Sequence, residues 1–369
     1  MTEFDRHILR NCIQKVATGP EYSKDLSYDE AYAAMCCALS GKADPVQVGV
    51  FLIALRMKRE TPAENAGVLQ AILDNTRHEV AQVDEVLDIA EPYNGQVRGL
   101  PAAPFLAPLL AACGLPAYSH GVAVLGPKFG ITHHNVLQAA GVNVSRSAKA
   151  VAERLADPAI GWGYSDQAQF CSPLHELAEL RKRIVKRPVL TTVEVLAQPI
   201  RGREKTHLLT GYVHKAYPPV YATLARQANY YSAVIVHGVE GGVIPSLSQA
   251  AKTFVYQALG EEREHIVDPR ELAITQTQRN MPLPDNLPEA VECEGITAAV
   301  DVPSAAHAAA ECGIAALHGE NGMPRDSLIY GAAIALHGAG RCESLRDGAD
   351  AARRALDDGA AFAHFEAGM

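Results

Sequence analysis

The 369-residue sequence has no run of about 20 apolar residues, the length that a membrane-spanning helix needs. Its N-terminus, MTEFDRHILRNC, is charged and lacks the apolar core of a secretory signal peptide. None of the eight cysteines belongs to a CxxC pair, and several have apolar neighbours, which favours free thiols in a reducing compartment. These absences predict a soluble cytoplasmic protein without a membrane segment.

Basic and aromatic residues are both in the minority. The 33 Lys and Arg are outnumbered by 42 Asp and Glu, giving a net charge of −9. This balance argues against a basic nucleic-acid-binding surface over the whole chain, but not against a local one. Aromatic residues make up only 6%, so the core is built mainly from Ala, Leu and Val. A chain of this length can bury a large core in one or two domains without disulfides or metals.

The segment before about residue 75 is expected to be helical. Apolar residues recur at helical spacing over 4–16. Three later helix starts have capping signals, which are Ser27 to Glu30, Asp44-Pro45, and Thr61 to Glu64. The helix over 45–57 has an apolar stripe that should face a partner: Val46, Val50, Ile53, Ala54 and Met57. Nothing in this segment indicates catalysis.

From Val83 the pattern changes to short apolar strands alternating with Ala-rich helices, which predicts a parallel α/β sheet. A strand at 86–89 ends at the turn Glu91-Pro92-Tyr93-Asn94-Gly95, and residues 104–113 are apolar throughout, as in a buried helix. Such units place ligands at the carboxyl ends of parallel strands. The residues fit an anion-binding turn and an ordinary connection equally well.

A charged, Pro-bounded helical stretch over about 166–200 interrupts the alternation. Further strands are expected at 208–211, 232–236 and 298–300. Helices are expected to end at about 140 and to span 219–228, 305–317 and 349–358, the last being the final helix.

These features together resemble the anthranilate phosphoribosyltransferase family, including the strand that ends in Val236-His237-Gly238. The resemblance covers nearly the whole chain. It implies the α/β fold with a small all-α domain of the nucleoside phosphorylase and phosphoribosyltransferase group, glycosyltransferase family 3. It assigns 1–78 plus about 166–200 to a helical dimerisation domain, and 79–165 plus about 201–369 to the α/β domain. It also implies a homodimer formed through the helical domains.

The motifs of the family's chemistry are replaced in this sequence. Its GTGGD loop, which binds a diphosphate, corresponds to 91–95, and its KHGNR segment reads Ser119-His120-Gly121-Val122-Ala123. Its magnesium-binding Asp-Glu pair corresponds to Val243 and Ile244, which leaves Glu240 as the acid nearby. A diphosphate normally needs neutralisation by a metal or by cations. The resemblance therefore predicts loss of the parent reaction, no metal site, and magnesium only if a diphosphate donor is used.

The replaced motifs are similar to those of the divergent YbiB-like branch of the family. They are Tyr93-Asn94-Gly95, Ser119-His120-Gly121-Val122 and Phe170-Cys171-Ser172-Pro173-Leu174. Members of that branch are described as binding nucleic acid through a basic surface. The resemblance thus implies a nucleic-acid-binding homodimer.

A group of eight cations supports the same expectation: Arg181, Lys182, Arg183, Lys186, Arg187, Arg201, Arg203 and Lys205. So many cations in an acidic chain create a local positive field, which could form a phosphate track with strong salt dependence. The alternative is a solvated helix face, which charge runs usually are. Arg181 also lies where the family has its anthranilate-contacting arginine.

The second hypothesis is an enzyme, a phosphoribosyl or other glycosyl transferase with a remodelled donor site. It would bind a small phosphorylated ligand in a cleft between the domains. The expected ligand-binding residues are Asn94, Gly95, His120, Gly121, Lys128 and Arg181. No catalytic residue is assigned. His133-His134 has no Cys or carboxylate at ligand spacing, which favours a capped helix start over a metal site. A purely structural role is a third possibility.

Overall fold

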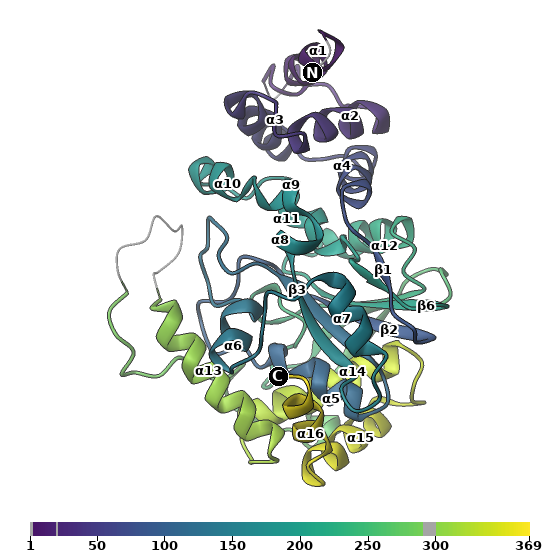
Figure 1. Cartoon of the computed structure of the whole chain (residues 1–369), viewed down its shortest axis with the longest axis vertical. Coiled ribbons are helices and arrows are strands. Elements are labelled where there is room, and N and C mark those ends of the chain that lie inside the picture. Colours follow the sequence, from purple (N-terminus) through teal and green to yellow (C-terminus); the bar gives the residue numbers. More distant parts are fainter. Residues whose placement is uncertain (1–2, 20, 291–299) are drawn as a thin grey trace.

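The computed structural model describes residues 3–19, 21–290 and 300–369. A small helical bundle stands on a larger α/β body (Figure 1). The bundle consists of α1 (Glu3–Val16), α2 (Tyr28–Leu39), α3 (Pro45–Lys58) and α4 (Pro62–Asp74). The helical N-terminal segment that the sequence predicts is therefore confirmed.

Side-chain caps determine where three of these helices begin. In α2 the backbone N–H of Glu30 donates to Ser27 Oγ, and the N–H of Ser27 donates to the Glu30 carboxylate. Thr61 and Glu64 form the same capping box at α4. At α3 the Asp44 carboxylate accepts two backbone N–H groups of the first turn. These caps satisfy donors that a helix start otherwise leaves unpaired, as the sequence pattern predicted.

The larger part is built on a seven-stranded sheet in the order β4-β3-β2-β6-β7-β8-β9. The first five strands in that order are parallel, which confirms the predicted α/β architecture. They are β2 (Glu85–Ala90), β3 (Ala117–Gly121), β4 (Trp162–Asp166), β6 (Lys205–Gly211) and β7 (Ser232–Val236). An antiparallel hairpin that the sequence did not predict, β8 (Ala251–Tyr256) and β9 (Arg263–Val267), extends one edge. A separate two-stranded pair joins β1 (Glu79–Val80) to β5 (Ile200–Arg201).

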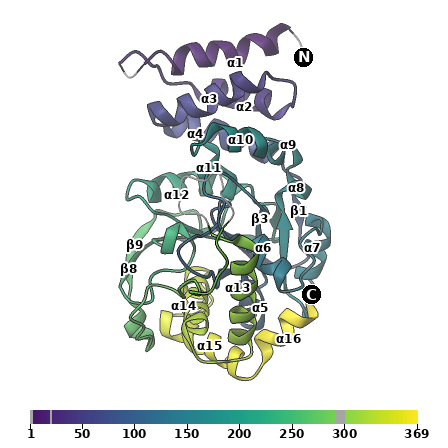
Figure 2. The ribbon, with the colours of Figure 1, turned by 90° about the vertical axis from the view of Figure 1, so that its left-hand side faces the viewer.

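Helices cover both faces of the sheet. In β2, Val86 and Ala90 pack on the face that continues into the bundle, while Leu87 and Ile89 pack on the opposite face, as the alternation of a strand requires. The first face is covered by α7 (Ala148–Leu155) and α12 (Tyr217–Gln227). The second is covered by η1 (Ala103–Phe105), α5 (Leu106–Ala112), α6 (His133–Ala139), α13 (Val302–Leu317), α14 (Met323–Gly338), α15 (Leu345–Asp357) and α16 (Ala360–Ala367). Figure 2 shows α14, α15 and α16 at the end of the molecule away from the bundle.

The insertion is helical as expected, but it is divided into short pieces. They are α8 (Gln167–Phe170), α9 (Ser172–His175), α10 (Ala178–Ile184), α11 (Leu190–Val193) and η2 (Glu194–Leu196). Helix α10 packs on α3. A Cβ added at Gly49 of α3 would lie 3.6 Å from Leu180 and 3.8 Å from Ile184, both of α10. This packing supports the proposed assignment of the insertion to the helical domain.

The C-terminal region differs from the expectation in two places. The helix expected at 349–358 is α15, but α16 follows it, and α14 was not predicted at all. Helix α14 is apolar and buried on nearly all sides, so it has no amphipathic period to detect. The strand expected at 298–300 lies almost wholly outside the described residues, and Val300 is in no strand. Within the described ranges, none of the helices is long and apolar enough to cross a membrane.

Candidate functional site

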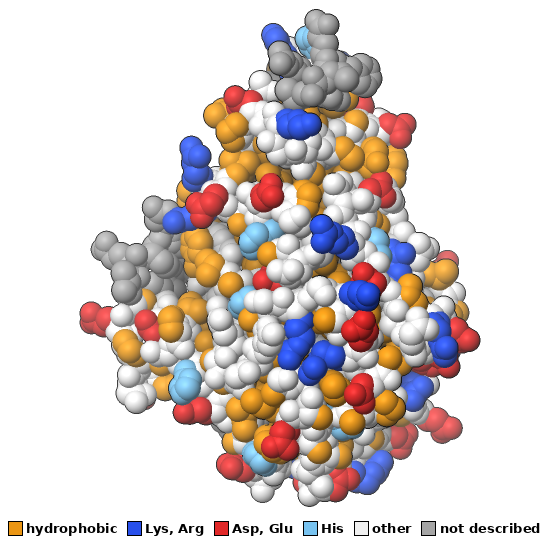
Figure 3. Space-filling model, in the orientation of Figure 1, with side chains coloured by type: hydrophobic (Ala, Val, Ile, Leu, Met, Phe, Trp, Pro, Cys, Tyr) orange, Lys and Arg blue, Asp and Glu red, His pale blue; other side chains and the backbone are white. Residues whose placement is uncertain are grey.

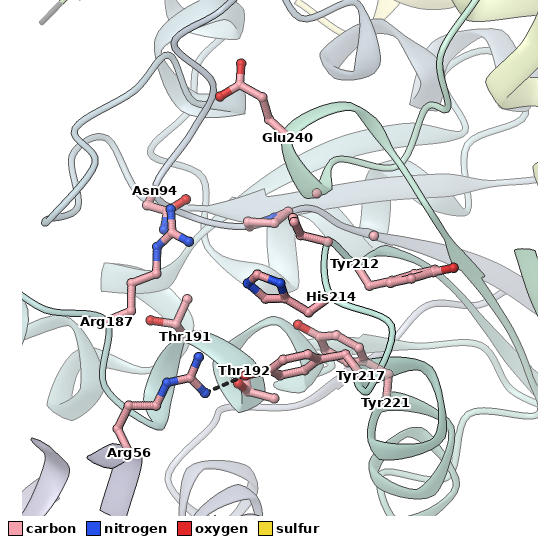
Figure 4. A pocket seen from close by; sticks show the side chains of 14 residues that line it. Arg56, Asn94, Arg187, Thr191, Thr192, Tyr212, His214, Tyr217, Tyr221 and Glu240 are labelled. Carbon is pink, nitrogen blue, oxygen red and sulfur yellow. Dashed lines mark hydrogen bonds between the residues drawn. The ribbon is translucent and has the colours of Figure 1, made fainter. Parts of the chain in front are cut away.

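A cleft of about 90 Å³ lies between the bundle and the carboxyl ends of the central strands (Figure 4). The loops after β2, β6 and β7 contribute to its walls, together with α3, α12 and the connection from α10 to α11. This is the edge at which parallel α/β sheets bind ligands. The side chains that line it and bear on its chemistry are Arg56, Asn94, Arg187, Thr191, Thr192, Tyr212, His214, Tyr217, Tyr221 and Glu240.

Two arginines reach this cleft from different elements (Figure 4). Arg56 of α3 donates from Nη1 to Tyr217 Oη at 2.5 Å and lies 3.5 Å from the Glu60 carboxylate. Arg187 Nε and Thr191 Oγ1 are buried and have no hydrogen-bond partner among the described residues. Burial, followed by the charge of Arg56, lowers the pKa of Arg187. Neighbouring cations and unsatisfied buried donors favour an anionic ligand.

The loops that hold Asn94 and Lys128 are fixed to each other. Gln96 and Ile131 exchange two backbone hydrogen bonds of 2.9 and 2.8 Å, and the N–H of Gly130 donates to the Asn94 carbonyl at 2.9 Å. Gly95 has φ +71°, and a Cβ there would lie 2.5 Å from the Gly130 carbonyl carbon. Only glycine fits this position, so Gly95 makes the turn and permits the close approach.

Lys128 does not present a free ammonium group to the cleft. Its Nζ lies 2.6 Å from the Glu240 carboxylate, and both side chains are more than nine-tenths buried. The same carboxylate accepts the backbone N–H groups of Val97 and Arg98 at 3.1 and 2.7 Å. Burial lowers the pKa of Lys128, although its pairing with Glu240 opposes this effect. In this structure Glu240 neutralises Lys128, and the predicted contact of Lys128 with a ligand stays a prediction.

Glu91, in the position of the family's diphosphate loop, is also paired. Its Oε2 lies 2.6 Å from His133 Nε2, and its Oε1 accepts from Gln96 Nε2 and from the backbone N–H of Val243. Burial raises the pKa of Glu91, but the neighbouring His133 and these hydrogen bonds outweigh it and hold the pKa below the ordinary glutamate value. His133 and His134 begin the capped helix α6, as the sequence predicted.

His120 belongs to a buried polar network below the cleft. Its Nε2 lies 2.9 Å from the Asp88 carboxylate, and its Nδ1 shares a hydrogen bond with Tyr93 Oη. Asp88 also accepts the hydroxyl groups of Tyr118 and Tyr230, each at 2.7 Å. All five side chains are buried. His120 is therefore enclosed by its own chain in this structure, and its contact with a ligand stays a prediction.

Arg181 is enclosed in the same way. Its side chain is 1% exposed, and its guanidinium binds the Glu194 carboxylate through two contacts of 2.5 and 2.8 Å. Gly121 is buried as well, facing the rings of Tyr93 and Tyr164. An anion could reach Arg181 only after this pair had separated. In this structure Arg181 is therefore a buried, paired cation and not a surface one, and its contact with a ligand stays a prediction.

Of the remaining cations of the insertion, one lines the cleft and the others are exposed on or just after α10. Lys182, Arg183 and Lys186 are exposed at the end of α10 and just beyond it, and Arg187 is the residue that enters the cleft. The surface face in Figure 3 has Lys and Arg side chains interspersed with Asp and Glu. We call Lys182, Arg183, Lys186 and Arg187 the α10 cation group.

The other three predicted cations lie elsewhere. Arg201 ends β5, and Arg203 and Lys205 are at the amino end of β6. The cleft is at the carboxyl end of β6, about 20 Å away for a strand of this length. Arg203 pairs with Asp84, and Lys205 lies over the Tyr231 ring. The single phosphate track expected from the sequence is therefore divided into two separate groups.

Sequence reasoning missed several residues of the cleft. Arg56 is in the helical module, and Thr191, His214 and Tyr217 belong to no motif. No signal in the sequence brings Arg56 to Arg187, because only the packing of the bundle on the sheet does so.

The residues near the cleft do not fit a magnesium ion. No group of three or more His, Cys, Asp and Glu that could hold a metal exists within the part of the chain that the structure describes. Val243 and Ile244, which the sequence resemblance predicts to replace the family's metal carboxylates, have apolar side chains, and Val243 is fully buried. The Glu240 carboxylate is already bound by Lys128 and two backbone N–H groups.

Comparisons with known proteins agree with this architecture. Residues 10–76 match the helical bundle domain of a glycosyl transferase family, and residues 103–362 match its a/b domain. The matched ranges leave out 77–102, which contain the loop 91–95. The chain is 28% identical over 363 residues to an anthranilate phosphoribosyltransferase of Thermomicrobium roseum, covering 97% of this chain and 95% of the relative.

Solved structures share the fold. The anthranilate phosphoribosyltransferase (TrpD) of Thermus thermophilus superposes with a TM-score of 0.74 at 20% identity, covering 98% of this chain and 97% of that chain. The Saccharomyces cerevisiae enzyme in complex with PRPP and Mg has a TM-score of 0.73 at 17% identity, covering 98% and 96%. The two domain matches and the full-length relatives show that the chain belongs to the anthranilate phosphoribosyltransferase family of glycosyl transferases.

Proposed function

We propose that the protein is a homodimer that binds nucleic acid through the α10 cation group, which includes Arg187 of the cleft, and through Arg56. We also propose that it does not catalyse the parent reaction. The observation that supports this most is that Arg56 and Arg187 both line the cleft. There Arg187 Nε and the Thr191 hydroxyl are buried without a hydrogen-bond partner among the described residues. Exposed Arg183 and Lys186 precede Arg187 in the insertion and add positive charge there, and Arg183 also lines the groove between α3 and α10. Such an arrangement suits a chain of phosphates, which needs successive cations along a path.

The proposed loss of the parent reaction is supported by how the donor region is filled. Glu91 and Glu240 are each bound to a neighbouring cationic or imidazole side chain and to backbone N–H groups. The cleft of about 90 Å³ is also small beside the roughly 300–1,000 Å³ of typical ligand pockets. Both features favour contact with part of a polymer over enclosure of a whole sugar diphosphate.

The homodimer is supported by the exposed stripe of α3. Val46 and Met57 are 70% and 75% exposed in the monomer, and Val50 is also exposed. Val46, Val50 and Ile53 border a mainly apolar groove between α3 and α10, which Arg183 also lines. An apolar helix face of this kind is typical of a protein–protein interface.

Charge reversal in the α10 cation group tests the proposed function. Arg183→Glu with Lys186→Glu should weaken binding of a fluorescent single-stranded oligonucleotide more than tenfold at low salt. The slope of log affinity against log salt should become less negative by about 1.4, since each lost contact with a single strand contributes about 0.7. Fluorescence anisotropy measures both quantities.

The matched control is Lys252→Glu with Arg263→Glu, which makes the same change in net charge on the exposed β8–β9 hairpin. Binding by this control should stay near that of the unmodified protein. Equal losses in the two double variants would show that net charge alone matters. Undiminished binding after reversal at Arg183 and Lys186 would show that the α10 cation group is only a solvated face.

A glycosyl transferase with a remodelled donor site is the second candidate. It is supported by the position of the cleft at the carboxyl ends of β2 and β6, where Asn94 and Gly211 contribute to its wall. Calorimetry with phosphoribosyl pyrophosphate and magnesium should then give saturable heat that Arg187→Ala abolishes. No heat from the unmodified protein would rule against this candidate.

A further inference from the structure

The Glu240 carboxylate occupies a set of donors that would equally suit a phosphate group. Two successive backbone N–H groups, of Val97 and Arg98, donate to it at 3.1 and 2.7 Å, and Lys128 Nζ lies at 2.6 Å on its other side. Successive N–H groups joined by a lysine are a common arrangement for holding phosphate oxygens. In this chain a side chain of the protein itself fills that arrangement.

The backbone around Glu240 is unusual for a residue that only completes an ion pair. Glu240 has φ +53°, in the left-handed region that non-glycine residues rarely adopt. It is followed by Gly241, with φ +86°, and by Gly242, where a Cβ would lie 2.2 Å from Glu91 Oε1. A tightly coiled glycine loop therefore presents this carboxylate to the donors.

The charged groups near the carboxylate include two cations, Lys128 and Arg187, and one further acid, Glu91, which is paired with His133. Lys128 is buried with Glu240, and Arg187 interacts electrostatically with both Glu240 and Lys128. Glu240 also contributes to the wall of the cleft that Arg56 and Arg187 enter. An incoming anion would thus find cations on more than one side once the carboxylate had moved.

We infer that Glu240 is an internal plug, which fills a phosphate-binding site formed by the N–H groups of Val97 and Arg98 and by Lys128. A phosphate-bearing ligand competes with this carboxylate, and the unmodified protein consequently binds inorganic phosphate weakly. The inference goes beyond oligonucleotide binding, because the plugged site lies on the loop 95–98 and at Lys128, and the exposed cations of α10 do not contribute to it.

Removal of the negative charge tests the plug. Glu240→Gln keeps an oxygen that can accept the two N–H groups, so the loop can keep its course while Lys128 loses its internal counter-ion. Isothermal titration calorimetry with inorganic phosphate should show at least tenfold tighter binding by Glu240→Gln than by the unmodified protein. Adding Lys128→Met to Glu240→Gln should abolish the gain. The control Glu264→Gln removes the acid of an exposed pair with Lys252 on the β8–β9 hairpin and should change nothing.

Every outcome bears on the inference. Equal phosphate affinity in the unmodified protein and Glu240→Gln would overturn it, as would a gain that survives the loss of Lys128. If Glu240→Gln fails to fold, Glu240→Ser provides the same test. If neither variant folds alone, added phosphate should restore folding by replacing the carboxylate, and the absence of such rescue would also overturn the plug. Oligonucleotide binding measured on the same samples distinguishes this result from a failure of the proposed function.

Discussion

Arg181 and Glu194 form a buried pair within the insertion, where its helices meet the sheet. Both side chains are 1% exposed, and two contacts join guanidinium to carboxylate. Taking two charges out of water costs free energy that only good geometry repays, so loss of one partner leaves the other in an unfavourable environment. This pair should therefore matter to stability, whatever the protein binds.

Arg181→Met should lower the free energy of unfolding by about 3–5 kcal/mol, because Glu194 then remains buried without a counter-charge. Urea denaturation followed by circular dichroism measures the change. The exposed neighbour provides a control, since Arg183→Met should change stability by less than about 0.5 kcal/mol. A loss below about 1 kcal/mol for Arg181→Met would contradict the buried arrangement. Such a result would return Arg181 to the surface cations.

The helix caps of the bundle could be predicted from the sequence, whereas the burial of Arg181 could not. The caps at Ser27, Asp44 and Thr61 were predictable, because a cap depends on residues within one helical turn. The burial of Arg181 was not, because its partner Glu194 lies thirteen positions away on a different short helix. A run of cations in a sequence does not show which of its members turns inward.

At the scale of elements, α3 has two apolar sides with different roles. Phe51, Leu52 and Leu55 are buried within the chain, whereas Val46 and Met57 are largely exposed. Of the stripe that the sequence expected to face a partner, Val46, Val50 and Met57 are exposed, Ile53 is half-buried and Ala54 packs in the protomer's own core. A second copy of the chain is the partner that the homodimer proposal assigns to it.

Val46→Glu with Met57→Glu should convert the proposed dimer to a monomer, because the changes place four charges at the centre of a two-fold apolar interface. Analytical ultracentrifugation gives the mass directly. Each protomer should stay folded, since both side chains are already exposed. Lys42→Glu with Lys24→Glu, on exposed positions of the bundle, serves as control. An unmodified protein that sediments as a monomer, or a double variant that remains a dimer, would contradict the assignment.

Some elements could be predicted and others could not, for physical reasons. Strands β2 and β7 are buried apolar runs, so composition reveals them. Strand β9, Arg263–Val267, is an exposed edge strand with charges, a composition that blunts edge pairing and hides the strand from pattern analysis. The cleft was predictable in its position at the strand ends, but Arg56 depends on how the bundle docks.

At the scale of the whole molecule, the net charge of −9 opposes any polyanion at long range. The proposed nucleic-acid binding must then depend on short-range contacts at the α10 cation group and the cleft. Arg56 and the four members of that group give five cations per protomer that could each release a counter-ion. For a single strand, five such contacts predict a slope of about −3.5 in log affinity against log salt.

Titration of the unmodified protein with a fluorescent single-stranded oligonucleotide across salt concentrations tests this account most directly. Affinity should fall about a hundredfold between about 50 and 200 mM salt, following from that slope. Phosphoribosyl pyrophosphate with magnesium, added as competitor, should leave the binding unchanged. Absence of binding, a slope near zero, or displacement by this small donor would contradict nucleic-acid binding and favour the transferase.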